Sequence, residues 1–227
     1  MFSMKAFLRA FLICFITVSA VKGAVDTLGV VVMDGQILDN RELEREIKRY
    51  RSSVLKDYAY QLQTISVADF WDTEYEGVTP KKKLEDKALQ ALKRLKVQEK
   101  MLKQKGLWPY ETYQDLLTER PVNNERRKMA VQKSEIIYGP VEFTEQSFFD
   151  YQFSNAVIKL KQLMEGKEIP ISKALLVAHF EKMKKDVFIA QAYTFQQVEK
   201  RVKTHYLEQS YERFVDSLSQ QSEINKQ

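Results

Sequence analysis

The residues that could carry out catalysis are few and are separated along the chain. The single cysteine is Cys14, and the histidines are His179 and His205. Neither histidine has the spacing of a metal-binding HExxH motif, and the GxSxG, GxGxxG and GxxxxGK[ST] patterns do not occur. Carboxylate pairs such as Glu85 and Asp86 alternate with lysines, as on a solvated helix face. The sequence therefore predicts no catalytic residue, no metal site and no cofactor, and it favours a binding protein over an enzyme.

The histidine at position 179 has a structural interpretation. It shares one face of a predicted helix with Leu176 and Met183, and Phe180 follows it directly. A histidine in such a setting is usually hydrogen-bonded at the edge of the core. We therefore expect His179 to be a core-edge residue rather than a general base.

Cationic side chains concentrate in the segment 79–106. Thr79 suits the N-cap of a helix, Pro80 its first position and Gly106 its C-terminal stop. Apolar residues recur every three or four positions, so one face of this helix is apolar. The other face is basic, and its members are Lys81, Lys82, Lys83, Lys87, Lys93, Arg94 and Lys100. The segment is predicted to be a long helix with one buried and one cationic side.

Large aromatic residues near loops or on second helix faces are the candidates for binding apolar peptide segments. They are Phe70, Trp71, Tyr75, Trp108, Phe148 and Tyr151. Adjacent rings such as Phe70 and Trp71 in a polar loop usually pack into a core, and the alternative is a peptide-binding lip. Phe148, Tyr151 and Ile158 give the helix predicted over 144–166 a second apolar side, which favours burial over binding of an apolar ligand.

The N-terminus has the pattern of an export signal. Lys5 and Arg9 precede a short apolar run over 10–20, and small residues permit cleavage after Ala20 or Gly23. An uncleaved membrane anchor is the alternative. Removal of residues 1–23 takes away three cations and no acid, so the formal charge falls from +5 to +2. We expect an exported, extracytoplasmic protein, in the periplasm or on the outer face of the cytoplasmic membrane, and so small a charge argues against nucleic acid as a partner.

The remaining sequence predicts a mainly α-helical fold. Glycine and proline are scarce, with 7 and 5 copies, and apolar residues make up 44% of the chain. A short strand is expected over 30–33, and helices over 39–62, 113–118, 123–133, 144–166, 172–185 and 195–220. Pro121 is expected to break the helical segment in which it lies. Residues 136–143 suggest a small hairpin, and the tail near Ile224 could add a strand.

The order of these segments resembles the N-terminal chaperone module of the SurA/PrsA family of extracytoplasmic foldases. Residues 30–43 are similar to the opening strand, turn and first helix of that module. Residues 69–71, the basic helix and residues 124–128 resemble the PrsA-like branch, and so do residues 136–143 leading into the helix that contains Phe148. The resemblance extends over most of residues 30–222.

The resemblance implies a domain organisation. It predicts a signal peptide over 1–23 and one helical chaperone-like domain over 24–227, in which a core module of residues 30–186 is closed by the C-terminal helix 195–220. It also implies a small β element that joins the two ends. Family foldases carry a parvulin-type prolyl isomerase domain before the last helix, but here only residues 188–193 lie there, which is too short for a domain. We therefore expect no parvulin domain.

Three functions follow as hypotheses. The first is an exported, ATP-independent chaperone whose partners are unfolded or partly folded exported proteins. The second is a peptidyl-prolyl isomerase, which family membership alone would imply. The third is a cell-envelope protein that uses its basic helix to bind an anionic surface. A homodimer is a further possible assembly.

Overall fold

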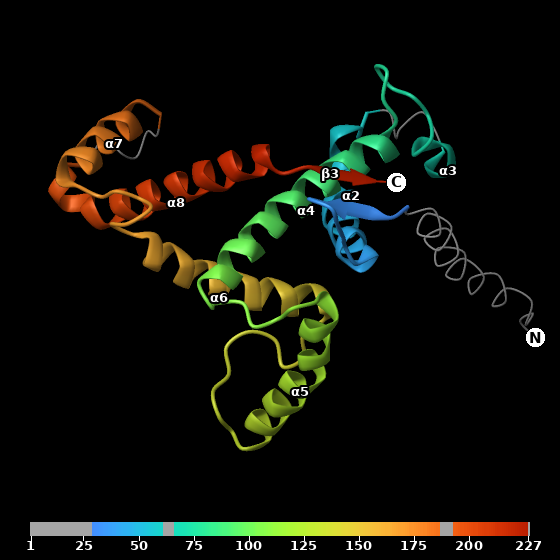
Figure 1. Cartoon of the computed structure of the whole chain (residues 1–227), viewed down its shortest axis with the longest axis horizontal. Helices are drawn as coiled ribbons and strands as arrows, with labels where there is room; N and C mark the ends of the chain where they lie inside the picture. The colour runs from blue at the N-terminus through green and yellow to red at the C-terminus, as the bar shows by residue number, and fades with distance from the viewer. Residues whose placement is uncertain (1–28, 61–65, 187–192, 227) are drawn as a thin grey trace, which may run out of the picture. The chain divides into compact units, whose positions relative to one another are not determined.

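The structure is a computed structural model, and it describes residues 29–60, 66–186 and 193–226 (Figure 1). It is mainly α-helical with a small antiparallel sheet, which confirms the predicted fold class at that level. The predicted signal peptide and nearly all of residues 188–193 lie outside the described residues. The helices are α2 (Asn40–Asp57), α3 (Val67–Phe70), α4 (Pro80–Gln104), α5 (Tyr113–Gln132), α6 (Glu145–Met164), α7 (Lys173–Asp186) and α8 (Phe195–Gln221).

The described chain groups into two compact units. The first contains the residues up to Ala88 together with Ile224–Lys226, and the second is Leu89–Glu223. Helix α4 begins in the first unit and ends in the second. Whether the chain is one domain, as the sequence suggested, stays a prediction.

A three-stranded sheet in the first unit joins both ends of the described chain. Its strands are β1 (Val31–Met33), β2 (Gln36–Ile37) and β3 (Ile224–Lys226), in the order β2-β1-β3, and both pairings are antiparallel. Val31 pairs with Lys226, and Met33 pairs with Ile224. The predicted strand near Ile224 and its union with the N-terminal strand are therefore confirmed.

Local sequence signals set the ends of the helices. Asp39 caps α2 by accepting a hydrogen bond from the backbone N–H of Arg41. Thr79 caps α4 through the N–H of Lys82. At the other end of α4, Gly106 adopts a φ of +67°, and the N–H of Leu107 bonds to the carbonyl of Leu102. This is the Schellman arrangement, in which a left-handed residue satisfies the last carbonyls.

Each unit has its own apolar core. In the first unit Val54, Tyr58, Phe70 and Leu84 are buried together. Phe70 contacts Tyr58 edge-on at 5.8 Å and Trp71 at 5.0 Å between ring centroids. In the second unit a larger core joins α4, α5, α6, α7 and α8, and its fully buried members include Leu102, Phe148, Phe149, Leu160, Phe180 and Tyr211. These cores provide the rigid scaffold for any surface site.

Three local predictions were wrong. Helix α2 ends at Asp57 rather than near Leu62. Helix α5 continues through Pro121, because the fixed φ of proline fits a helix and the rest of the helix tolerates the missing hydrogen bond to the carbonyl of Leu117 and the crowding of this carbonyl by the ring. Residues 136–143 form a loop and no hairpin, because α5 supplies the partners of this backbone.

Replacement of Phe70 by alanine tests the first core. The ring is fully buried, so its loss should lower the free energy of unfolding of that unit by about 3–5 kcal/mol. Chemical denaturation measured by circular dichroism would show the change. Tyr60→Ala is the matched control, because this ring is exposed and its removal should have little effect. Equal stabilities of the two variants would contradict the assignment.

Candidate functional site

The six aromatic candidates occupy different environments. Phe70, Trp108 and Phe148 are buried in the two cores, whereas Trp71 and Tyr75 are partly buried. The guanidinium of Arg51 lies over the Trp71 ring, 4.5 Å from its centroid. Burial places Phe70, Trp108 and Phe148 in the cores, which is the core interpretation expected for Phe70. Client binding by Trp71, Tyr75 and Tyr151 stays a prediction.

Tyr151 is the exposed member of this set, with 44% of its surface accessible. It lies on α6 beside Phe143, with ring centroids 5.1 Å apart. Ile158, two turns further along α6, is also exposed. The expectation that the second apolar side of this helix is buried is correct for Phe148 and wrong for Tyr151 and Ile158. The reason is that Phe148 belongs to the buried core, whereas Tyr151 and Ile158 line an open hollow between α5 and α6.

The basic side of α4 is largely neutralised within each unit. In the first unit Lys83 and Lys87 both reach Asp57, at 3.4 and 2.8 Å, and the hydrogen bond from Lys87 lowers the pKa of this carboxyl below its ordinary value. Lys81 pairs with Asp72 and Lys82 with Asp86. In the second unit Arg94 pairs with Glu212 and Asp216 of α8, and Lys93 donates to the Ser222 carbonyl. Lys100 is exposed and has no ion pair with a described residue. Most of these cations are therefore engaged in ion pairs or hydrogen bonds within their own unit.

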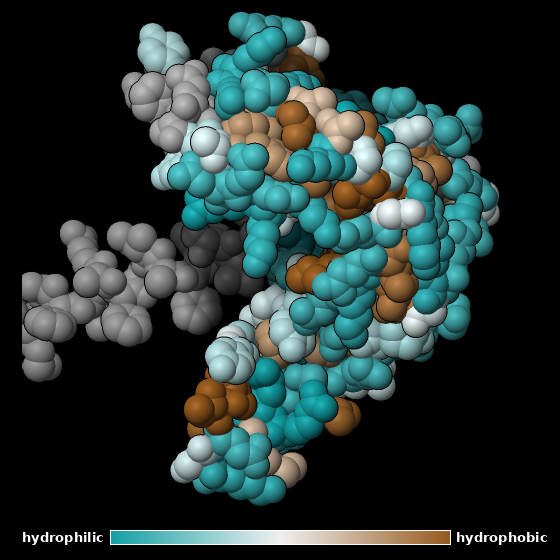
Figure 2. All heavy atoms as spheres, turned by 90° about the vertical axis from the view of Figure 1, so that its left-hand side faces the viewer, coloured by the Kyte–Doolittle hydropathy of each residue, from teal (hydrophilic) through white to brown (hydrophobic). Residues whose placement is uncertain are grey.

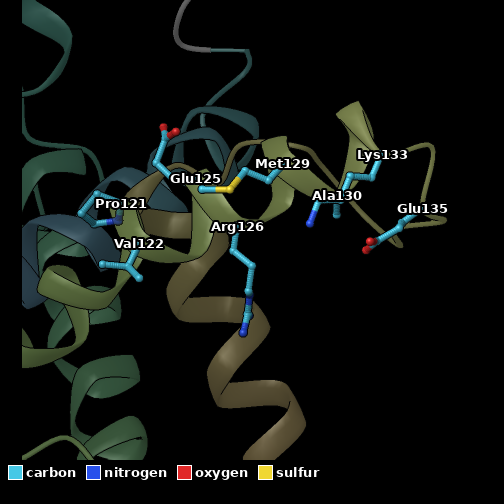
Figure 3. A pocket seen from close by; sticks show the side chains of 8 residues that line it. All are labelled: Pro121, Val122, Glu125, Arg126, Met129, Ala130, Lys133 and Glu135. Atoms are coloured by element: carbon cyan, nitrogen blue, oxygen red, sulfur yellow. The ribbon is translucent and has the colours of Figure 1, made fainter.

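The outer face of α5 carries a hollow of about 590 Å³ that the sequence did not predict (Figure 3). Val122 and Met129 lie two turns apart and are 71% and 54% exposed. Pro121 and Ala130 complete the apolar lining, and the rim is formed by Glu125, Arg126, Lys133 and Glu135. Figure 2 shows apolar atoms among polar ones in the lower part of the molecule, at the height of α5 in Figure 1. An open apolar hollow with a charged rim is suited to weak binding of apolar side chains.

The end of α5 closes one side of this hollow. Ser134 adopts a left-handed φ of 60°, and the N–H of Glu135 bonds to the carbonyl of Ala130 at 2.9 Å. This is again the Schellman arrangement, with serine in the position that glycine usually takes. It turns the chain back over the last turn of the helix, which brings Glu135 to the rim.

Two side chains of α5 hold the loop of residues 134–143. The buried Asn124 amide donates to the carbonyl of Phe143 at 3.0 Å and accepts from its N–H at 2.8 Å. Arg127 donates to the carbonyls of Tyr138 and Pro140, and its guanidinium lies 4.8 Å from the centroid of the Phe143 ring. The loop therefore satisfies its backbone on α5 while Tyr138 stays 85% exposed.

The two histidines form a pair between α7 and α8. Nε2 of His179 and Nδ1 of His205 are 2.8 Å apart, and His179 is buried, which confirms its core-edge position. Tyr206 contacts the His179 ring edge-on at 5.4 Å. Burial lowers the pKa of His179, and repulsion by His205, Arg213 and Lys182 lowers it further. Folding therefore favours the neutral form of His179.

Within the described ranges, no cluster of three or more His, Cys, Asp or Glu side chains could hold a metal ion. Across the same residues, no helix combines the length and the apolar character needed to span a membrane. The candidate site is the apolar surface of α5 and its neighbours.

No protein-family model, curated protein or solved structure matches this chain. The resemblance to the SurA/PrsA foldases thus depends on the sequence segments alone.

Sequence reasoning missed the residues that form the hollow. Val122, Arg126, Met129 and Lys133 follow a helical spacing of four, three and four residues, which is a detectable stripe. The expected break at Pro121 concealed it, because a helix starting after this proline would be too short to show the repeat.

The loop clamp can be tested with Asn124→Ala. The substitution leaves the N–H and the carbonyl of Phe143 without their partner, which should lower the free energy of unfolding by about 1–3 kcal/mol. It should also speed proteolysis within residues 134–143. Asn155→Ala is the matched control on the exposed surface of α6. Unchanged stability and cleavage in the Asn124 variant would show that the clamp does not hold the loop.

The histidine pair predicts acid sensitivity. Because the pKa of His179 is lowered in the folded protein, the unfolded chain binds a proton first as the pH falls below about 6.5. The contribution of His179 to stability is therefore complete above that pH and is lost as the pH falls through its folded pKa. Urea unfolding at about pH 7.5 and about pH 5.5 should show a smaller acid loss in His179→Gln than in the natural protein. The same loss in both proteins would refute the prediction.

Proposed function

We propose that this protein is an ATP-independent chaperone that binds unfolded or partly folded exported proteins. The observation that carries the proposal is the hollow of α5, where Val122 and Met129 are exposed side by side with Pro121 and Ala130. An extended apolar segment could bury its side chains there at about 25 cal/mol per Å² of apolar surface removed from water. So small an area gives weak and reversible binding, which a holding chaperone needs.

The surroundings of the hollow support the same function. The loop of residues 134–143 adds exposed Ile136 and Tyr138, and α6 adds exposed Tyr151 and Ile158. Tyr151 and Ile158 stand on a helix fixed by the large core, and the loop that carries Ile136 and Tyr138 is held by Asn124 and Arg127, so the apolar surface is available without unfolding. The charged rim keeps such a surface soluble and discourages self-association. The export-signal pattern at the N-terminus would place this activity outside the cytoplasm.

The alternative functions have less support. The ion pairs of α4 leave few free cations for an anionic envelope surface. Prolyl isomerase activity would need a catalytic domain, and only residues 187–194 separate α7 from α8. The chaperone proposal is therefore supported by an apolar surface among the described residues. The two alternative functions have no comparable surface or domain among these residues.

An aggregation assay tests the proposal. Denaturant-unfolded citrate synthase would be diluted into buffer, and its light scattering followed with and without equimolar protein. The natural protein should suppress scattering, and Val122→Asp combined with Met129→Asp should need about tenfold more protein for the same effect. Leu175→Asp with Val177→Asp is the matched control, because these are exposed aliphatic residues of α7 outside the hollow.

Two outcomes would contradict the proposal. One is unchanged scattering at equimolar natural protein. The other is equal suppression by the hollow variant and the natural protein, provided that circular dichroism shows both to be folded. Loss of activity in the α7 control alone would place client binding on another surface.

A further inference from the structure

A second hollow, of about 560 Å³, lies between α5 and α6. Helix α5 contributes Asn123 and Arg126, and α6 contributes the rest of the lining. Arg126 borders both this hollow and the one on the outer face of α5. In Figure 3 its side chain points away from Met129, on the side where α6 runs. A ligand in either hollow would therefore lie beside Arg126.

The second hollow differs from the first in its amide groups. Asn123, Gln152, Asn155 and Gln162 line it, and each amide carries two donor hydrogens and an acceptor oxygen. None of the three amides on α6 is hydrogen-bonded through its side chain to another described residue, and Oδ1 of Asn123 is buried without a donor among the described residues. Amides of this kind match the N–H and C=O groups of an extended polypeptide, whatever its sequence.

The charged side chains that line this hollow, Arg126 and Lys159, are both positive. Arg126 and Lys159 are exposed, and neither forms an ion pair with a described residue. Among the residues that the structure describes, no Asp or Glu lines the hollow. The neighbouring cations are engaged, because Arg127 binds the loop carbonyls and Lys128 pairs with Glu125. Arg126 and Lys159 therefore form a pair of free cations on the path of a ligand.

The hollow also offers apolar contacts. Tyr151 and Ile158 belong to its lining and are 44% and 54% exposed. The combination of amides, two cations and two apolar side chains fits a peptide with carboxylates and apolar residues. An anionic lipid headgroup satisfies it less well, because phosphate oxygens only accept hydrogen bonds and would leave the amide oxygens without donors.

We propose that the groove between α5 and α6, lined by Arg126, Lys159 and the amides, binds extended segments of unfolded polypeptide that are acidic as well as apolar. This inference rests on the proposed chaperone function and names its client class. Carboxylates of the client pair with Arg126 and Lys159, while its backbone bonds to the amides and its apolar side chains contact Tyr151 and Ile158.

Binding of three labelled peptides by fluorescence anisotropy tests the inference on the full chain. The peptides are unstructured, share the same leucines, and carry either two glutamates, two glutamines or two lysines. The glutamate peptide should bind about tenfold more tightly than the glutamine peptide at low salt, and the lysine peptide most weakly. The preference should shrink between about 0.05 and about 0.5 M salt.

Charge reversal locates the site. Arg126→Glu with Lys159→Glu should remove the preference for glutamate and favour the lysine peptide instead. Lys173→Glu with Arg201→Glu is the matched control, because it makes the same change of charge at exposed positions outside the groove and should keep the preference. Since both cations are exposed, folding should be preserved, and circular dichroism would verify this.

The results separate this inference from the proposed function. If the natural protein suppresses aggregation but binds the three peptides equally, the acidic client class is overturned and the chaperone function stands. If it prefers the glutamate peptide without suppressing aggregation, the groove assignment stands and the chaperone function fails. A glutamate preference that survives reversal of Arg126 and Lys159, or that the control abolishes equally, overturns the groove. Binding to phosphatidylglycerol vesicles that depends on these two cations, with no peptide preference, would replace the peptide by a lipid surface.

Discussion

The surface proposed to bind clients depends on one buried amide. Asn124 of α5 pairs with both backbone groups of Phe143, the residue that precedes the cap of α6. A single side chain thus fixes the start of one helix against the middle of another, while Arg127 holds the intervening loop. Because the loop's backbone is satisfied on α5, its apolar side chains need not be buried to keep it in place. Helix α5 lines both hollows, and α6 lines one of them.

The distribution of charge separates structural cations from cations available to a ligand. Along α4, lysines that look like a polyanion-binding face in the sequence are paired with Asp57, Asp72 and Asp86. Exposed pairs of this kind contribute little stability each, but they remove free positive charge from the surface. On the groove between α5 and α6 the situation is reversed, since Arg126 and Lys159 have no such partners among the described residues. The two unpaired cations beside the groove are therefore better placed to bind an acidic ligand than the many paired cations of α4.

Features that depend on neighbours in the sequence were predictable. The caps at Asp39 and Thr79 and the stop at Gly106 are local hydrogen-bond requirements, so residue type sufficed. The fully buried Phe70 followed from the cost of leaving two adjacent rings in water. Pro121 misled the prediction, because its effect depends on whether the rest of the helix compensates for one lost hydrogen bond. Among the aromatic candidates, only packing could separate the exposed Tyr151 from the buried Phe148, since both stand on the same helix.

The sequence by itself determined the helical class and most helix ends, because periodicity and capping act over a few residues. The pairing of the terminal strands was implied by the family resemblance and not by such local patterns, because these strands lie at opposite ends of the described chain. The sequence also predicted no catalytic residue. Tertiary structure alone decided which apolar residues remain outside the core and which cations lack a partner. These properties depend on contacts between residues such as Asn124 and Phe143, or Arg94 and Glu212, that are far apart along the chain. The candidate binding surface of α5 and α6 is defined by what such contacts leave uncovered.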